Sequence, residues 1–488
     1  SLFIDNPFFG HDKLVFRGKA INEKREGGII TDDYFKNPFT DGTENITTNR
    51  YELEANYTKT INKKVDLSFT NTFINHNREA TNDSYLLSYL ETHNNETPNV
   101  LDMRPYLAKE NSLISTLTLG TTFGDHHLLF GLQNYLTRLN ESGMYVVVDE
   151  SSPYYGNSYK STALKHAHEI GAFIQDEWRV TSEFTIVPGI RIDHHVSGEE
   201  YTSDKTIFDG DFPKTSFDQT SINPRLALKY NLSEHITLRA NMGTGFRAPY
   251  GFSEDLHLCS GSPRVWKSSD LKAETSRSTN FSADYYGHQF QISANVFYTY
   301  LKDKIDFTDA DENVKNLGYT YQWRNIDDAV VKGIEMMILV NPIKSLNIGA
   351  DFGINSGEYK QLRQDWVGTQ YESNSKYIPR FPTTTGSLKI EYAPRLWNFS
   401  VYGLYQGKMF IDYMSEDANK SAIIQTDPYM TFNASVSRTF GNVRLYAGGK
   451  NIFSYIQDKK YLDDAAFMYA PVYGAQYYTG ISININNL

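Results

Sequence analysis

The feature that most constrains the fold of this chain is a strict alternation of apolar and polar side chains. Residues 65–70 are apolar at every odd position and polar at every even one. The same two-residue period runs through residues 184–193, 346–355 and 481–486. It is the period of a β-strand with two unlike faces, whereas a sustained helical period of 3.6 residues is almost absent. The sequence therefore predicts an all-β fold.

The length of the alternating segments and the absence of long apolar runs point to a membrane protein built of strands. About ten alternating residues cross an outer membrane at a tilt. No apolar run approaches the roughly 18 residues that a transmembrane helix needs, which excludes a helical membrane protein. In lipid, strands survive only in a closed ladder that pairs every backbone group. The prediction is a large transmembrane antiparallel β-barrel.

Short polar connections alternate with long ones along the whole chain. The short ones are expected near 62–64, 124–126, 181–183, 233–235, 287–288, 341–345, 394–396 and 440–442. The long ones are expected near 21–46, 79–108, 141–163, 197–219, 246–273, 303–326, 359–379, 413–426 and 456–473. Outer-membrane barrels have this layout, with about 18 strands here and both chain ends on the short-turn side. A soluble multi-sheet β-sandwich protein, the alternative, rarely keeps one side short throughout.

Charge and cysteine content exclude several other classes of protein. The formal net charge is −11 and no basic stripe is present, which argues against nucleic-acid binding. A single cysteine, Cys259, permits no internal disulfide and no cysteine-based zinc site. Aromatic residues near strand ends are candidates for rings at the headgroup level of the membrane. These are Tyr51, Trp178, Tyr230, Trp397, Tyr402, Tyr477 and Tyr478.

Several stretches resemble the TonB-dependent receptor family, in register over about residues 170–488. They include AFIQDEW at 172–178, PGIRID at 188–193 and the FRAP signature of Phe246, Arg247, Ala248 and Pro249. Residues 223–230, 271–276, 331–335, 378–382 and 450–453 are similar to further family stretches. Residues 254–257 look closest to receptors of Bacteroidetes-type bacteria.

The resemblance implies a barrel of about 22 strands with an N-terminal plug and a TonB box. Neither the plug nor the box is found in this sequence. We therefore expect residues 1–488 to form one outer-membrane β-barrel domain that starts around the family's fifth strand, with the plug and first strands missing. The C-terminus departs from the pattern, because it continues past Ile485 to Asn-Asn-Leu rather than ending on an aromatic residue.

The function that the resemblance implies is TonB-dependent active import of a scarce nutrient chelate across the bacterial outer membrane. The expected cargo is a ferric siderophore, cobalamin or haem. Expected partners are outer-membrane lipid or lipopolysaccharide, TonB acting through the missing plug, and a surface lipoprotein. No catalytic residues and no cofactor are expected. The alternative is a passive porin or a structural barrel component of an outer-membrane complex.

The loop after FRAP supplies the candidate ligand-binding residues. They are Tyr250, Phe252, His257, Arg264 and Trp266. In haem-uptake members of the family a loop histidine after FRAP can bind iron, which gives His257 a functional interpretation. The alternative is a solvated loop histidine.

Three other motifs are weighed against simpler interpretations. The spacing Gly243-x-Gly245-x-x-Ala248 matches part of a dinucleotide fingerprint, but Pro249 breaks the helix that this site needs. Asp309, Asp311 and Asn313 resemble the start of a calcium loop without its later ligands, so loop Ca²⁺ is an open alternative to a solvated acidic tip. The histidine pairs are His126 and His127, His166 and His168, and His194 and His195.

Among these pairs, His166 and His168 share one strand face, which could chelate a metal, and they are expected to line the lumen. Inward carboxylates in the strands are expected to pair with lumen arginines. The acids are Asp176, Glu177 and Asp193, and the arginines are Arg179, Arg191, Arg225 and Arg239.

Overall fold

The computed structural model is almost entirely β-sheet, which confirms the all-β prediction. It describes residues 2–6, 12–28, 42–204, 214–249, 265–268, 270–317, 319, 321–363, 367–413, 422–458 and 468–484. The helical segments in these ranges are α2 (Ser84–Thr92), α3 (Glu312–Lys315) and the 3-10 turn η4 (Glu372–Asn374). No helix in the described ranges has both the length and the apolarity to cross a membrane.

Eighteen long strands form the wall of the barrel, in agreement with the number expected from the sequence. They are β2 (Asp12–Gly27), β3 (Glu44–Asn62), β4 (Val65–Asn82), β5 (Tyr106–Phe123), β6 (His126–Val146), β7 (Ser158–Arg179), β8 (Phe184–Thr202), β9 (Thr215–Asn231), β10 (Ile236–Arg247), β12 (Glu274–Tyr286), β13 (Phe290–Asp309), β14 (Tyr321–Ile343), β15 (Leu346–Tyr359), β16 (Thr384–Tyr392), β17 (Trp397–Gln406), β20 (Tyr429–Phe440), β21 (Val443–Lys450) and β22 (Gln476–Ile483). Each pairs antiparallel with its neighbours along the chain.

Two further strands join this sheet and two lie outside it. The five-residue β1 (Leu2–Asn6) pairs with β2, and the short β11 (Val265–Lys267) pairs parallel with the start of β14. β18 (Phe410–Tyr413) and β19 (Ala422–Gln425) form a separate hairpin. Within the described residues, β22 pairs with β21 alone and β1 with β2 alone, so these two strands are the edges of the sheet.

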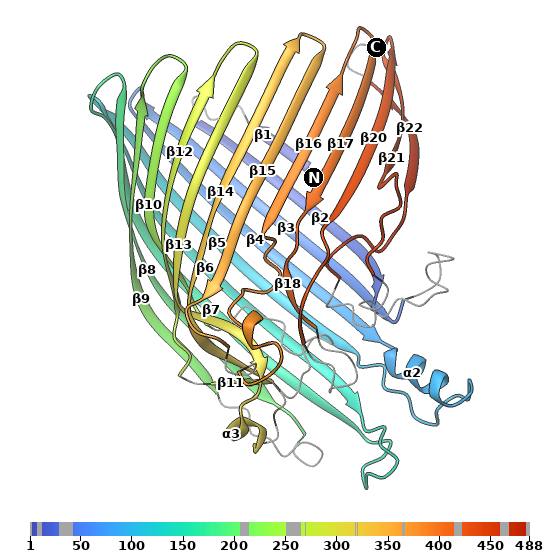
Figure 1. Cartoon of the computed structure of the whole chain (residues 1–488). Helices are drawn as coiled ribbons and strands as arrows, with labels where there is room; N and C mark the ends of the chain where they lie inside the picture. The colour runs from blue at the N-terminus through green and yellow to red at the C-terminus, as the bar shows by residue number, and fades with distance from the viewer. Residues whose placement is uncertain are drawn as a thin grey trace.

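The connections have the two lengths that the sequence predicted. All eight predicted short turns join neighbouring strands at one end of the barrel, while α2, α3 and β11 gather at the other end (Figure 1). Gly124 and Gly441 each take a φ of +57° in two-residue turns, where tight hairpins require left-handed backbone. The long-loop end is called the loop end below.

The strands extend further toward the loop end than the alternating pattern indicated. The expectation was about ten residues per strand. The structure gives 21 residues for β6 and 22 for β7, which reach into the predicted loop 141–163. In these outer parts the burial still alternates, but the buried inward positions include the polar residues Glu141, Ser161 and Lys165, so the apolar–polar pattern that marks a strand in the sequence is lost.

The side-chain distribution is inverted relative to a soluble protein, as a membrane barrel requires. Large apolar side chains are exposed at alternate positions on the outer face, such as Leu132, Ile170 and Ile192, while Gln133, Arg191 and Asp193 face inward. Six of the seven aromatic candidates for the membrane interface are exposed, and Tyr402 is half-buried.

One inward-facing glycine gives a test of the packing. Phe173 lies opposite Gly131, and a Cβ at Gly131 would be 2.1 Å from the Phe173 ring. We expect Gly131→Ala to lower the free energy of unfolding by about 1–3 kcal/mol, because the ring must leave its rotamer. The measurement is urea unfolding in detergent.

The matched control is Gly349→Ala. A Cβ at Gly349 meets only Leu339 Cδ1, at an ordinary 3.8 Å. Equal unfolding free energies for the two variants would show that the Phe173 ring does not need the space left by the missing side chain of Gly131.

Candidate functional site

The middle of the lumen contains a hydrogen-bonded cluster on β6, β7 and β8. Arg191 Nη2 lies 2.6 Å from Asp193 Oδ1 and donates to Gln133 Oε1 at 2.8 Å. His195 Nδ1 lies 3.3 Å from Glu169 Oε2, and Glu169 Oε1 lies 3.7 Å from Arg191. The predicted pairing of Asp193 with a lumen arginine is therefore confirmed, and the cluster gives the lumen wall both charge signs.

Of the other two predicted carboxylates, Glu177 pairs with a predicted arginine and Asp176 does not. Asp176 lies 2.7 Å from His126 Nδ1 rather than beside an arginine. Glu177 is 3.6 Å from Arg179 in an exposed pair at the short-turn end. Arg239 pairs with Asp284 of the neighbouring β12.

Closer to the loop end, a second network of charges is almost completely removed from solvent. Lys165 Nζ lies 2.7 Å from Glu141 Oε2, and both side chains are 0% exposed. Tyr106 donates to Glu141 Oε1 at 2.8 Å. A buried ion pair of this kind requires opposite charges in good geometry, because desolvation costs several kcal/mol per ion.

This network, called the loop-end network, continues onto a loop segment. Glu199 lies opposite Lys165 in the β7–β8 register and accepts from Tyr201 at 3.1 Å. Lys267 Nζ of β11 donates to both Glu199 carboxylate oxygens, at 3.0 Å each. The segment that follows the FRAP loop is thereby attached to the inner wall of the barrel.

The FRAP signature lies beside this attachment. The β9–β10 pairing ends at Gly243, and the Phe246 ring lies 6.3 Å from His195 and 6.0 Å from Phe217. Arg247 Nη2 lies 3.6 Å from Glu274 Oε2. Ala248 is buried, and Pro249 is the last described residue before the loop. FRAP therefore marks the position where the chain leaves the wall.

At residues 271–276 the chain returns to the barrel wall, where hydrogen bonds connect this stretch to β13 and β14. Leu271 and Ala273 are buried. The Asn325 amide accepts from Lys272 N at 2.9 Å and donates to Lys272 O at 3.0 Å, while Glu274 accepts from Ile305 N at 3.1 Å. Two of the family-like motifs thus frame one loop.

Of the predicted ligand-binding residues, the structure describes one. Trp266 packs against Tyr319, with the ring centroids 4.9 Å apart, next to the buried Ala310 and Val314. This places Trp266 in a small apolar cluster between two loops. Tyr250, Phe252, His257 and Arg264 lie outside the described residues, as does Cys259.

The calcium motif is partly described. The Asp311 carboxylate accepts from Val314 N at 3.0 Å as the N-cap of α3, which satisfies a backbone donor at the helix start. The side chain of Asp309 lies outside the described residues. In the described part of the chain, no three or more His, Cys, Asp or Glu side chains are grouped for a metal ion.

The expectation that His166 and His168 line the lumen is wrong. Both share the outward parity of Ile170, while Lys165 and Ala167, on either side of His166, are buried inward. His168 Nε2 lies 2.8 Å from Asn134 Oδ1 on the same outer face. The error arose because spacing shows that two residues share a face without showing which face it is.

Two tyrosines in the long loops, Tyr85 and Tyr155, remain protonated at neutral pH. Burial raises the pKa of Tyr85 on α2 and that of Tyr155 in the loop between β6 and β7. Hydrogen bonds from Ser151 lower the pKa of the Asp149 carboxyl in the same loop. At neutral pH the loop end therefore presents neutral phenol donors beside ionised carboxylates.

The loop-end network was not found from the sequence. Glu199 and Lys267 fall in two predicted long loops, where charge normally indicates solvation, and Glu141 begins a third. Lys165 lies in a strand whose alternation is weak. The only available signal was that a lysine on an inward position of β7 needs an acidic partner on a neighbouring strand.

Comparison with known proteins shows which family model and which relatives this sequence matches. The model of the family described as TonB dependent receptor-like, beta-barrel matches residues 5–452. An iron-regulated outer membrane virulence protein of Vibrio cholerae is 26% identical over 266 residues, which are 52% of this chain and 36% of that protein. The ferrienterobactin receptor of Escherichia coli is 23% identical over 45% of this chain and 28% of its own length. The chain thus matches only about a third of these relatives.

A solved structure shares the fold over nearly the whole chain. The siderophore receptor PiuA from Acinetobacter baumannii superimposes with a TM-score of 0.71 over 97% of this chain and 72% of that one, at 11% identity. At this identity the likeness concerns the fold alone.

The attachment of β11 can be tested by substituting Lys267. We expect Lys267→Met to destabilise the loop by about 3 kcal/mol, because it removes two hydrogen bonds from a carboxylate that is 0% exposed. The measurement is faster amide hydrogen exchange at residues 265–267 and 321–323.

Lys272→Met is the control, because that side chain is exposed in the same loop. Adding Glu199→Gln to Lys267→Met should restore part of the protection, since a neutral amide is less costly to bury. Unchanged exchange in Lys267→Met would refute the attachment.

Proposed function

This chain belongs to the TonB dependent receptor-like β-barrel family, and we propose that it forms the barrel of a receptor that imports a nutrient chelate. The barrel is a bacterial outer-membrane protein, as its family and its apolar outer face indicate. The proposed import is active and depends on TonB. We assign the chain to transport rather than to catalysis.

The observation that carries the proposal is the attachment of the post-FRAP segment to the inner wall. Lys267, bound to Glu199, holds β11 at the loop end, and Phe246 packs against His195 below it. A long loop that is fixed at both of its ends can present side chains toward the barrel mouth in a defined arrangement. Preorganisation of this kind lowers the entropic cost of binding a bulky ligand.

The proposed cargo is a ferric siderophore, with haem and cobalamin as the alternatives. Two relatives carry iron or ferrienterobactin in their names, and a vitamin B12 transporter from Photobacterium profundum is 23% identical over 45% of this chain. The loop end offers cations, carboxylates and neutral phenols, which suit a large anionic or mixed-charge chelate. We propose that Tyr250, Phe252, His257, Arg264 and Trp266 contact it.

The import proposal requires parts in addition to this barrel. A lumen this wide needs a plug to prevent leakage, and energy must reach that plug through TonB. We propose that the plug and the TonB-contacting segment belong to the same protein, and that a surface lipoprotein covers the loop end. The family match does not support the passive porin alternative.

Dependence on TonB is the direct test of the transport proposal. The full-length protein is produced in cells that lack their own receptors, with and without TonB. Ferric enterobactin, haem and cobalamin are supplied separately, and growth and uptake of the labelled compound are measured. We expect uptake of one of them only in cells with TonB. Equal uptake without TonB would identify a passive porin.

The ligand-contact assignment is tested at Trp266 and His257. We expect Trp266→Ala and His257→Ala each to weaken ligand affinity about tenfold, as loss of an interface anchor does. Trp266→Phe keeps the aromatic contact with Tyr319 and separates packing from ligand contact. Tyr154→Ala, at an exposed loop position, is the control. Unchanged affinity for all three compounds would reject these contacts.

A further inference from the structure

Two histidines from different turns meet at the short-turn end of the barrel. His235 is the last residue of the turn between β9 and β10, and His288 lies in the turn between β12 and β13. Their imidazole centroids are 6.4 Å apart, and the two ring planes are inclined by 69°. Both side chains are exposed. We propose that the two imidazoles bind one divalent transition-metal ion, Cu²⁺ most tightly, and thereby link the two turns.

The hydrogen bond of His235 leaves one of its ring nitrogens available for a metal. Its Nδ1 lies 2.9 Å from the backbone oxygen of Tyr286. A carbonyl oxygen can only accept, so Nδ1 carries the hydrogen, and in the neutral ring Nε2 carries the free lone pair. A histidine that binds a metal through one nitrogen commonly donates from the other to a backbone carbonyl or a carboxylate. The ring of His235 is therefore already oriented as a ligand.

Backbone hydrogen bonds and an aromatic side chain fix the two turns. Tyr286 N donates to His235 O at 2.8 Å, so these two residues contact each other twice. In the second turn Gly287 N donates to Phe290 O at 2.9 Å, and a Cβ at Gly287 would lie 2.8 Å from the Tyr285 ring. The Tyr285 ring thus lies over this turn, with its centroid 6.0 Å from that of His235. The backbone that carries both histidines is therefore set before a metal binds.

The spacing of the two rings suits a shared ion after a small side-chain rotation. At metal–nitrogen distances of about 2.0–2.1 Å, two imidazoles on one ion have their centroids roughly 5–6 Å apart. The observed 6.4 Å is slightly longer. Because both side chains are exposed, small changes of their χ angles within a rotamer well can close the difference at little cost. The described residues group no third histidine, cysteine or carboxylate with them, so water completes the coordination.

The charges of the two turns favour a cation. Residues 232–235 and 287–289 contain one acid, Glu234, and no lysine or arginine. The turns on either side contribute Glu183 and Lys344, one charge of each sign. Imidazole nitrogen suits Cu²⁺, Ni²⁺ and Zn²⁺ rather than Mg²⁺ or Ca²⁺, and Cu²⁺ binds most tightly among the divalent ions of the first transition row. The expected ligand is therefore a transition-metal ion, independently of the cargo proposed above.

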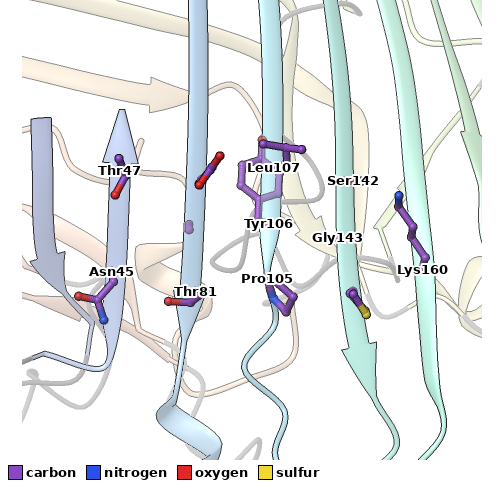
Figure 2. Close-up of a pocket in the computed structure, with 12 residues that line it drawn as sticks. Asn45, Thr47, Thr81, Pro105, Tyr106, Leu107, Ser142, Gly143 and Lys160 are labelled. Atoms are coloured by element: carbon purple, nitrogen blue, oxygen red, sulfur yellow. The ribbon is translucent and has the colours of Figure 1, made fainter. Parts of the chain in front are cut away.

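A hollow near the loop end illustrates a surface without this arrangement (Figure 2). It has a volume of about 420 Å³, and none of the residues that line it is a histidine. Its charged side chains are Glu79 and Lys160, which offset each other. Such a surface offers a divalent metal ion neither imidazole ligands nor a net negative charge. The pair of His235 and His288 is the stronger candidate for a metal site.

The test uses the full-length receptor in detergent, purified without a histidine tag and freed of metals with EDTA. Cu²⁺ alone is the probe, and its affinity is measured by isothermal titration. We expect His235→Gln and His288→Gln each to weaken the tightest Cu²⁺ binding about a hundredfold, because chelation by two linked ligands is lost. His93→Gln is the matched control. Nδ1 of His93 also contacts a backbone oxygen, that of Tyr89 at 3.0 Å, but the ring stacks on Tyr89 rather than facing an imidazole.

Two further measurements separate this site from unrelated copper binding. Electron paramagnetic resonance of the tightest-bound Cu²⁺ should show two imidazole nitrogens in wild type and in His93→Gln. Amide hydrogen exchange at residues 232–236 and 286–290 should slow with Cu²⁺ in these two proteins and not in the site variants. Unchanged affinity in both site variants overturns the proposal, as does an equal loss in His93→Gln. A single imidazole nitrogen in wild type, or exchange in the two turns that does not respond to Cu²⁺, also overturns it.

Discussion

The structure depends on one constraint, which is that a backbone N–H or C=O in lipid has no water to pair with. Each unpaired group costs several kcal/mol, so the chain satisfies them by pairing every long strand with its neighbours along the sequence. Consecutive antiparallel pairing then places one face of each strand in lipid and the other in the lumen. Leu132 beside Gln133, and Ile192 beside Asp193, are direct consequences.

A polar lumen creates a second requirement, because inward charges that are buried must find partners. In the middle of the barrel this produces the Arg191 and Asp193 pair with Glu169 and His195. Closer to the loops it produces the Glu141 and Lys165 pair, whose side chains are 0% exposed. The same requirement binds a loop to the wall, and thereby connects the stability of the barrel to the geometry of its mouth.

The sequence predicted some of these features and missed others for identifiable reasons. The short turns were correct because Gly124 and its counterparts combine turn-forming residues with a break in the alternation. The strand ends were not, because the outer parts of β6 and β7 bury polar residues such as Glu141 and Lys165 on the inner face, so the apolar–polar alternation of the sequence is lost although the burial still alternates. The inward parity of Arg191 was readable beside two isoleucines, whereas around His166 the apolar residues Leu164 and Ala167 fall on opposite faces and do not orient it.

The sequence by itself determined the period of the strands, the positions of the tight turns and therefore the antiparallel order of the wall. These are local properties, set by neighbouring side chains and by the backbone conformations that particular residues allow. Only the tertiary structure decided which charges meet. Lys165 meets Glu199 because of the register between the neighbouring strands β7 and β8, whereas Glu199 and Lys267 are separated in the chain by long loops and meet because of the return path of β11. Register is a property of pairs of strands, so a single strand's sequence does not contain it.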